Sequence, residues 1–347
     1  MNRCQGKSGN TVTSRIWKGR DNLLLDSYSR AFSYLRLSLL PVCNFRCVYC
    51  LPNGNPKEAL HQTHLSRTEI RRLVSALAEL GIRKVRLTGG EPTLRPDLLE
   101  VAKDISGISG VEKIALTTNG YRLAEQAHEL KRNGISAINV SVDSLVQENF
   151  AAITGQDRLP EVLEGIHAAQ AAGISQIKIN AVVLKGLNER EIENFLLWSE
   201  REPIDVRFIE LMPTKDNGEF FAKRHLSLGF LETLLSHRGW KRMEREETAG
   251  PADVWEKPGA LGKIGLIRPY STNFCNSCNR LRVTSQGDLQ LCLFGKGNLS
   301  LRPLLQNEAQ REELKSFVLC ALGKKNFSHS LHEGDYGSTR NLAAMGG

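Results

Sequence analysis

The 347-residue chain lacks the marks of several common protein classes. No apolar run approaches the length of a transmembrane helix, and the first 30 residues hold no continuous apolar segment that would direct secretion. Aromatic residues make up only 6% of the chain, and Lys and Arg form no long block despite a net charge of +8. No patch interleaves basic and aromatic residues, so we expect no nucleic acid and no membrane as partner. The positive balance fits either a smaller anionic partner or a solvated basic surface.

The eight cysteines do not resemble the disulfide framework of a small secreted protein. Six form two groups of three, spaced C-x3-C-x2-C at Cys43, Cys47 and Cys50, and C-x2-C-x13-C at Cys275, Cys278 and Cys292. Such grouping indicates metal ligation in a reducing compartment, which we expect to be the cytoplasm.

Residues 1–23 read as a disordered basic extension. Residues 1–20 carry five basic side chains and no acidic one, mixed with Ser and Thr. An organelle transit peptide has this composition too, which would place the protein in an organelle matrix. The apolar stripe that a transit helix needs is poor, so we favour the disordered extension.

From residue 33 to residue 212 the chain alternates strand-like and helix-like segments. Strands are predicted at 33–39, 83–88, 112–117, 136–142, 176–184 and 204–210, and helices at 67–80, 122–133, 160–172 and 189–200, with a last helix at 308–322. Ser66 and Glu69 match the S-x-x-E capping box, and Gly81 sits where a helix C-cap belongs. Repeated β–α units predict an α/β fold with a parallel sheet. The pattern alone does not separate a barrel from an open sheet.

Short unusual motifs follow these predicted strands. CNFRCVYC (43–50) follows the first, GGEP (89–92) the second and TTNG (117–120) the third; SVDS (141–144) ends the fourth, and Leu211–Met212–Pro213 follows the sixth. The active site of a parallel α/β fold lies at the carboxyl ends of its strands. The motifs are therefore expected to form one site.

Each cysteine group offers three thiols and no fourth cysteine or histidine close by in the sequence. Thiolates select zinc, copper(I) or iron–sulfur clusters. A structural zinc site normally closes its shell with a fourth ligand, whereas a cluster with three protein ligands leaves one iron open. For the second group, a three-cysteine zinc site closed by a distant ligand also stays open.

The first group, with Tyr49 before its last cysteine and GGEP after the next strand, resembles the radical S-adenosylmethionine (SAM) enzymes. The resemblance implies a partial (β/α)6 barrel over residues 24–240. It also implies a [4Fe–4S] cluster on the three cysteines, with SAM chelating the open iron. The residues implied to contact SAM are Tyr49, Gly90, Ser141 and Met212.

A wider set of motifs resembles the GTP 3′,8-cyclase family of molybdenum cofactor biosynthesis. It includes YLRLS, VRLTGGEPTLRPDL, RFIELMP, FCNSCNRLRVTSQGDLQLCLFG and a terminal Gly-Gly, and it runs from about Leu24 to Gly347. The resemblance implies a second [4Fe–4S] cluster on Cys275, Cys278 and Cys292, within a C-terminal region 241–347, with the guanine of GTP at its open iron. The implied GTP contacts are Arg36, Arg86, Thr117, Lys178, Arg280, Leu281 and Arg282. Gly346 and Gly347 would form a tail that assists catalysis.

The implied reaction converts GTP to 3′,8-cyclo-7,8-dihydro-GTP. A 5′-deoxyadenosyl radical from SAM would remove the 3′ hydrogen of GTP, and C3′ would then bond to C8 of guanine. An unidentified electron donor, hand-over of the product to cyclic pyranopterin monophosphate synthase and a homodimer are further expectations. Leu40–Pro41 departs from the polar pair usual in the family, and Pro41 removes a backbone donor beside the cysteine loop.

Two alternatives remain at the level of sequence. A different radical SAM enzyme, acting on RNA or a peptide, would keep the first cysteine group and GGEP but change the second group. The CNRLR stretch between the second cysteines argues against it, since paired arginines there suit a phosphate or carboxylate. A basic iron–sulfur or zinc protein that binds nucleic acid is the other alternative, and salt-dependent binding to DNA or RNA would support it.

Overall fold

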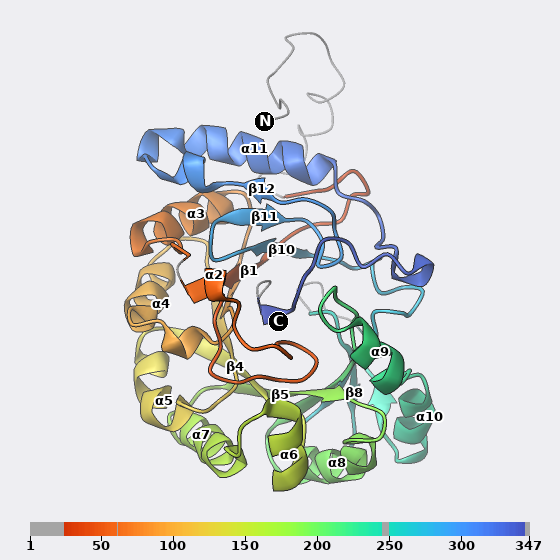
Figure 1. The fold of residues 1–347 in the computed structure, drawn as a ribbon. Coiled ribbons are helices and arrows are strands. Elements are labelled where there is room, and N and C mark those ends of the chain that lie inside the picture. Colours follow the sequence, from red (N-terminus) through yellow and green to blue (C-terminus); the bar gives the residue numbers. More distant parts are fainter. Residues whose placement is uncertain (1–23, 61, 245–249, 344–347) are drawn as a thin grey trace.

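The computed structural model describes residues 24–60, 62–244 and 250–343. Within these ranges a single sheet has the linear strand order β12-β11-β10-β1-β2-β3-β4-β5-β6-β9-β8-β7. The eight strands from β10 to β9 in this order run parallel to one another. The outer strands, β12 and β11 at one end and β8 and β7 at the other, pair in antiparallel fashion. The sheet curves without closing, with helices along its outer side, so the fold is a partial barrel (Figure 1).

The strands are β1 (Tyr34–Ser38), β2 (Lys84–Thr88), β3 (Lys113–Thr118), β4 (Ile135–Ser141), β5 (Gln176–Val183), β6 (Asp205–Glu210), β7 (Lys241–Arg242), β8 (Asp253–Glu256), β9 (Ile264–Ile267), β10 (Arg280–Val283), β11 (Asp288–Gln290) and β12 (Leu299–Ser300). The α-helices are α2 (Lys57–Leu60), α3 (Arg67–Glu79), α4 (Leu98–Ser106), α5 (Leu123–Arg132), α6 (Gln147–Thr154), α7 (Leu159–Ala171), α8 (Ile192–Arg201), α9 (Gly218–Arg224), α10 (Phe230–His237) and α11 (Arg311–Gly323). Short 3₁₀ turns are η1 (Pro92–Leu94), η2 (Glu189–Glu191), η3 (Arg302–Leu305), η4 (Glu308–Gln310) and η5 (Leu331–Glu333).

The predicted β–α units are confirmed, and each of strands β1 to β6 ends within one residue of its predicted bounds. Helix α3 begins with the predicted capping box, in which Ser66 and Glu69 exchange hydrogen bonds with each other's backbone N–H. Gly81 follows its C-cap with a φ of +99°, a conformation that glycine adopts without strain. The parallel sheet follows because each apolar strand is buried beneath the helices that connect it to the next.

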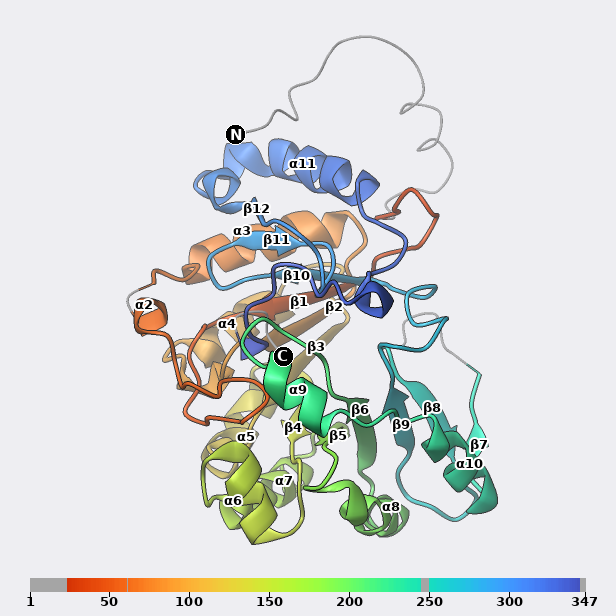
Figure 2. The same cartoon turned by 45° about the vertical axis from the view of Figure 1, so that its right-hand side comes forward.

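The C-terminal region extends the same sheet at both ends. Strand β9 pairs with β6, and β10 pairs with β1, both in parallel. Helix α11 lies over α3 (Figure 2), where Arg311 and Lys315 form ion pairs of 2.7 and 2.8 Å with Glu79. The division at residue 240 stays a prediction, since one sheet continues across it. In the described ranges no helix has the length and apolar character needed to cross a membrane.

Candidate active site

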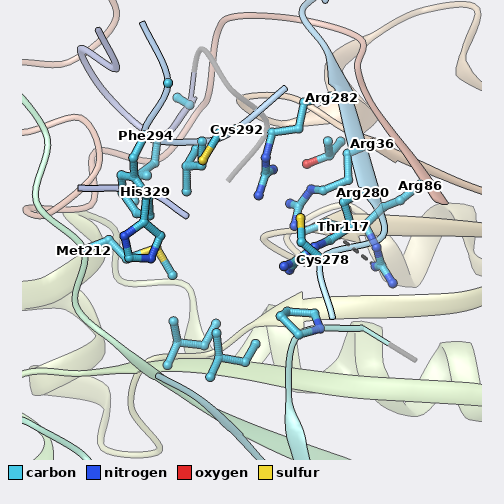
Figure 3. A pocket seen from close by; sticks show the side chains of 18 of the residues that line it. Arg36, Arg86, Thr117, Met212, Cys278, Arg280, Arg282, Cys292, Phe294 and His329 are labelled. Carbon is cyan, nitrogen blue, oxygen red and sulfur yellow. Dashed lines mark hydrogen bonds between the residues drawn. The ribbon is translucent and has the colours of Figure 1, made fainter. Parts of the chain in front are cut away.

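One cavity of about 680 Å³ lies at the carboxyl ends of strands β1 to β6. All six clustered thiols line it, the first three from the loop after β1 and the others from segments beside β10 and β11. GGEP, TTNG, SVDS and Leu211–Met212 also contribute lining residues. The expectation that motifs at the strand ends form one site is therefore confirmed. Figure 3 shows side chains from both barrel and C-terminal strands pointing into this cavity.

Local hydrogen bonds fix the loop that carries the first triplet, Cys43, Cys47 and Cys50. The Asn55 side chain accepts from the Cys43 N–H at 2.9 Å and donates to the Cys43 carbonyl at 2.8 Å. The Cys50 N–H donates to the Cys47 carbonyl at 2.9 Å. Burial raises the pKa of Cys43 to about 11 and that of Cys50 to about 12, and it also raises the pKa of Cys47. The thiols therefore stay protonated until a cationic centre binds them.

Two buried carboxylates lie beside this first triplet. Asp143 accepts from the Tyr49 hydroxyl at 2.8 Å. Glu91 accepts four hydrogen bonds of 2.6–3.0 Å from Thr93, Thr118 and Asn119. After burial, the negative charge of Glu91 is the largest cause of the raised pKa of Cys43, and that of Asp143 is the next cause for Cys47. This end of the cavity therefore favours positive charge.

Gly89 and Gly90 allow the GGEP segment to touch the cysteine loop. The Gly90 N–H donates to the Leu40 carbonyl at 2.7 Å. A Cβ on Gly90 would lie 2.1 Å from the Val42 carbonyl oxygen, and one on Gly89 would lie 2.5 Å from that of Leu40. Pro41 lies between Leu40 and Val42 in the sequence. It has no backbone N–H, and neither contact uses the backbone nitrogen of residue 41.

Hydrogen-bond donors and cations surround the second triplet. Burial alone would raise the pKa of Cys275, but hydrogen bonds from His329 and Ser328 lower it to about 6. Burial alone would also raise the pKa of Cys278. The positive charge of Arg280, and then that of Lys325, outweighs burial and lowers this pKa. This end of the cavity therefore favours thiolates and other anions.

Two rows of polar side chains cross three adjacent strands. Arg282, Arg36 and Arg86 occupy matched register positions on β10, β1 and β2. Two residues earlier, Arg280, Tyr34 and Lys84 occupy the matching positions. Side chains two residues apart on a strand share a face, and all six of these residues line the cavity. Figure 3 shows the four arginines directed into it.

The cations of these rows repel one another. Burial, and then the charge of Arg282, lowers the pKa of Arg36. The pKa of Arg282 falls to about 10 and that of Lys84 to about 8, with burial as the first cause. Burial opposes ionisation of Tyr34, yet the charges of Arg86 and Arg36 lower its pKa to about 7. A bound polyanion would relieve this repulsion, so the rows form a site suited to several negative charges.

Both triplets offer thiols, the donor type that iron–sulfur clusters and zinc share. Across the described ranges, no three His, Cys, Asp or Glu side chains gather closely enough to hold one metal ion. Thiols around one zinc ion must approach it to about 2.3 Å, whereas cluster ligands bind separate irons and lie farther apart. Three thiols can therefore serve a cluster whose fourth iron stays open.

Comparisons with known proteins show the family of the chain. Residues 37–198 match the Radical SAM superfamily, and residues 204–331 match Molybdenum Cofactor Synthesis C. A GTP 3′,8-cyclase of Tolumonas auensis is 48% identical over 325 residues, which cover 94% of this chain and 96% of that protein. The GTP 3′,8-cyclase of Aeromonas hydrophila subsp. hydrophila is 49% identical over 328 residues, covering 93% and 96%.

The chain belongs to the GTP 3′,8-cyclase family. Among solved structures, Streptococcus suis SuiB bound to S-adenosylmethionine matches with a TM-score of 0.60 at 14% identity, covering 90% of this chain and 77% of that one. At this identity the match supports the radical SAM fold alone.

The structure places most of the predicted site residues of this GTP 3′,8-cyclase family member on the cavity wall. Tyr49, Gly90, Ser141 and Met212 line it, as do Arg36, Arg86, Thr117, Arg280 and Arg282. The Arg86 side chain donates to the Thr117 hydroxyl at 3.1 Å. Lys178 is not among the lining residues and forms a 2.6 Å ion pair with Asp205. The Leu281 side chain is fully buried in the core.

The predicted tail is described only up to Ala343. Gly346 and Gly347 lie outside the described residues. Leu342 and Ala343 line the cavity, and their backbone groups hydrogen-bond the Cys50 thiol. The C-terminal segment therefore reaches the first triplet.

Sequence reasoning missed several residues that line the cavity, notably Tyr34, Lys84, Arg207 and His329. The first three carried a signal, because Tyr34-x-Arg36, Lys84-x-Arg86 and Asp205-x-Arg207 place polar residues two apart within buried strands. His329 carried none, since it is 37 positions after Cys292 and only the fold brings it to Cys275.

Proposed function

We propose that the protein converts GTP to 3′,8-cyclo-7,8-dihydro-GTP, the first step of molybdenum cofactor biosynthesis. One observation carries the proposal: two thiol triplets and two rows of polar side chains that hold five cations line the same cavity. The relatives described above, close to half identical over nearly the whole chain, carry the name of this activity.

The first triplet would hold a [4Fe–4S] cluster, and Tyr49, Gly90, Ser141 and Met212 would contact SAM. SAM carries a positive sulfonium and an ammonium group, which the buried carboxylates Glu91 and Asp143 complement. When bound, the cluster supplies the electron that cleaves SAM reductively and so starts the radical reaction. The chain itself orients SAM and shields the reaction from water.

The second triplet would hold another [4Fe–4S] cluster at the guanine end of GTP. Arg36, Arg86, Thr117, Lys178, Arg280, Leu281 and Arg282 are the proposed GTP contacts, with the cation rows against the triphosphate. Leu281 would act through its backbone, because its side chain is in the core. Lys178 would share its ammonium group between the substrate and Asp205. The end of the cavity at the first triplet favours positive charge, and the end at the second triplet favours negative charge. This difference would place SAM at the first end and GTP at the second.

The tail and the partners remain part of the proposal. Gly346 and Gly347 would act at the reacting end of the cavity, because the chain already lies beside Cys50 at Ala343. An external one-electron donor, hand-over to cyclic pyranopterin monophosphate synthase, a homodimer and a cytoplasmic location stay predictions.

Anaerobic turnover tests the proposal directly. The protein is reconstituted with iron and sulfide, given SAM and a strong reductant, and its products are identified by mass spectrometry with and without GTP. We expect 5′-deoxyadenosine to form together with an equal amount of cyclised GTP. SAM cleavage that leaves GTP unchanged would keep the first site and refute GTP as substrate. No cleavage with both clusters spectroscopically intact would refute the radical mechanism.

A further inference from the structure

An arginine in the turn before β1 contacts the second triplet from the barrel side. Its Nη1 donates to the carbonyls of Cys275 at 2.8 Å and Phe327 at 2.6 Å. Its Nη2 donates to the Asn326 carbonyl at 3.1 Å. This residue, Arg30, is only 8% exposed. It therefore joins three parts of the chain that are far apart in sequence.

The turn itself holds the Arg30 side chain in one orientation. The Asp26 carboxylate accepts from the Tyr28 N–H at 2.9 Å and the Arg30 N–H at 3.0 Å. Its second oxygen accepts from Arg30 Nε at 2.7 Å and pairs with Nη2 at 2.6 Å. Ser29 closes the turn with a φ of +62°, in the left-handed region. Hydrogen bonds within residues 26–30 thus hold the guanidinium in the orientation in which it contacts the Cys275 carbonyl.

Two aromatic rings cover this guanidinium. The Arg30 Cζ lies 5.5 Å from the ring centroid of Tyr28 and 5.2 Å from that of Phe327. The rings contact each other edge to face at 5.2 Å, yet they are 51% and 44% exposed. Their placement reduces water access to the guanidinium and strengthens its hydrogen bonds.

The hydrogen bonds of Arg30 separate it from the substrate-facing arginines. A guanidinium has five N–H donors, and the contacts above use all of them. Arg282, by contrast, lines the same cavity and its buried Nη1 has no hydrogen-bond partner within the described structure. Arg282 has a donor available for a ligand, whereas Arg30 has none.

We infer that Arg30 is a positioning residue for the second cluster site. Its rigid, saturated guanidinium holds the Cys275 loop against the 326–329 segment, which carries His329 to Cys275. This inference rests on the proposed function, because it assumes that the second triplet binds a cluster. Arg30→Lys keeps the charge but loses the planar fork, so it is expected to restore the geometry only in part.

Cluster loading tests the inference without relying on turnover. Arg30→Gln and Arg30→Lys are each combined with Cys47→Ser, which disables the first site, and reconstituted anaerobically. Iron content and the electron paramagnetic resonance spectrum then report the second cluster alone. We expect about four irons per chain in the Cys47→Ser parent, near zero with Arg30→Gln and an intermediate value with Arg30→Lys.

Arg72→Gln is the matched control. Arg72 also bridges the barrel to the C-terminal region, since its Nη1 donates to the carbonyls of Leu305 at 2.9 Å and Gln306 at 2.7 Å. Its partners carry no thiol, so the second cluster should remain. In the background with all six thiols, Arg30→Gln should still cleave SAM without GTP, which would show that the barrel has folded.

The outcomes distinguish the inference from the proposed function. A Cys47→Ser parent that binds no cluster would refute the two-cluster function and the inference with it. A parent that binds one, together with an Arg30→Gln variant of equal iron content and unchanged spectrum, would refute the inference alone. Equal losses in Arg30→Gln and Arg72→Gln would also overturn it, because they would indicate general destabilisation.

Discussion

The two thiol triplets share a cavity and a ligand type, yet their surroundings have opposite charge. Burial and the carboxylates Glu91 and Asp143 raise the pKa values of the first triplet. At the second, hydrogen bonds and cations outweigh burial and lower the pKa values of Cys275 and Cys278. Two sets of three thiols can thus suit different ligands when the charges around them differ. The first set suits a cationic cosubstrate and the second suits a polyanion.

The triplets also differ in how the chain assembles them. The first lies in one eight-residue motif, and its loop is held by hydrogen bonds to Asn55, to the carbonyls of Ile153 and Thr154 and to the side chain of Asn217. The second combines Cys275, Cys278 and Cys292 with Arg30 and His329, which lie hundreds of residues apart. The cysteines of the first site are therefore close together in sequence and those of the second are spread more widely, while the surroundings of both come from distant parts of the chain.

Removing one thiol from each triplet gives the largest expected effect. Cys47→Ser should abolish cleavage of SAM and all product formation, because in the proposed function the cluster on the first triplet would supply the electron that cleaves SAM. Cys278→Ser should retain cleavage of SAM without GTP but lose the cyclised product. Both are measured by anaerobic chromatography of 5′-deoxyadenosine and of GTP products. If both variants lost SAM cleavage equally, the division of roles between the triplets would be wrong.

Gly90→Ala should damage only the first site. Its Cβ would meet the Val42 carbonyl at 2.1 Å, so the cysteine loop must move. We expect loss of about half of the bound iron, since the second triplet lies on other segments, beside β10 and β11. Iron content and the spectra of the reduced clusters check the result.

Gly218→Ala is the control for this substitution. Nothing lies within 4 Å of a Cβ at Gly218, and it begins α9. The variant should be neutral or slightly more stable, because alanine favours a helix by up to about 1 kcal/mol relative to glycine. Full iron loading in Gly90→Ala would contradict the role given to the close loop contact.

Arg282→Leu should separate ligand binding from folding at the second site. Loss of one charge-assisted contact of about 1.5–3 kcal/mol predicts about 10- to 150-fold weaker GTP binding. The ligand-free protein should gain stability, because a buried and mutually repelling cation is removed. Calorimetry with GTP and thermal unfolding without it measure the two effects. Weaker GTP binding together with a lower unfolding temperature would argue that Arg282 is mainly structural.

Much of the barrel was predictable because its signals are local. Strands β1 to β6 are apolar runs bounded by turn residues, and the capping box of α3 is complete within four residues. Helix α4 went unpredicted, although Leu98, Val101, Ala102 and Ile105 form its buried stripe. Strands β9 and β10 also went unpredicted, because each has only four residues and depends on its neighbour for pairing.

The candidate site was predictable to the extent that its residues belong to continuous motifs. The six thiols and the arginines of β1, β2 and β10 were found in this way. Arg30 and His329 were not, since each acts through a contact with a distant residue. The Lys178–Asp205 pair likewise depends on the register between β5 and β6, which single-strand patterns do not contain.

The smallest expected effect concerns pH and the phenol of Tyr34. Its folded pKa of about 7 lies below the ordinary value of 10.0, so the unfolded chain binds more protons between these values. The contribution to stability is therefore fully present above pH 10 and is lost as the pH falls through 7. We expect the free energy of unfolding to rise from pH 7 to 9 more steeply in the native chain than in Tyr34→Phe, by at most about 1.4 kcal/mol per pH unit. Lys84, whose lowered pKa acts in the same direction, is present in both proteins, but the charge of Tyr34 raises its pKa, so the difference in slope reports Tyr34 together with its effect on Lys84. Anaerobic urea unfolding at several pH values measures this difference, with GTP titrations at the same pH values.

Ionised Tyr34 would oppose the triphosphate, so GTP affinity should decline with pH in the native chain and less in the variant. Equal slopes in both proteins would mean that the cations of the two rows do not act on the phenol, and the charge contrast between the two ends of the cavity would then be weaker than the geometry indicates.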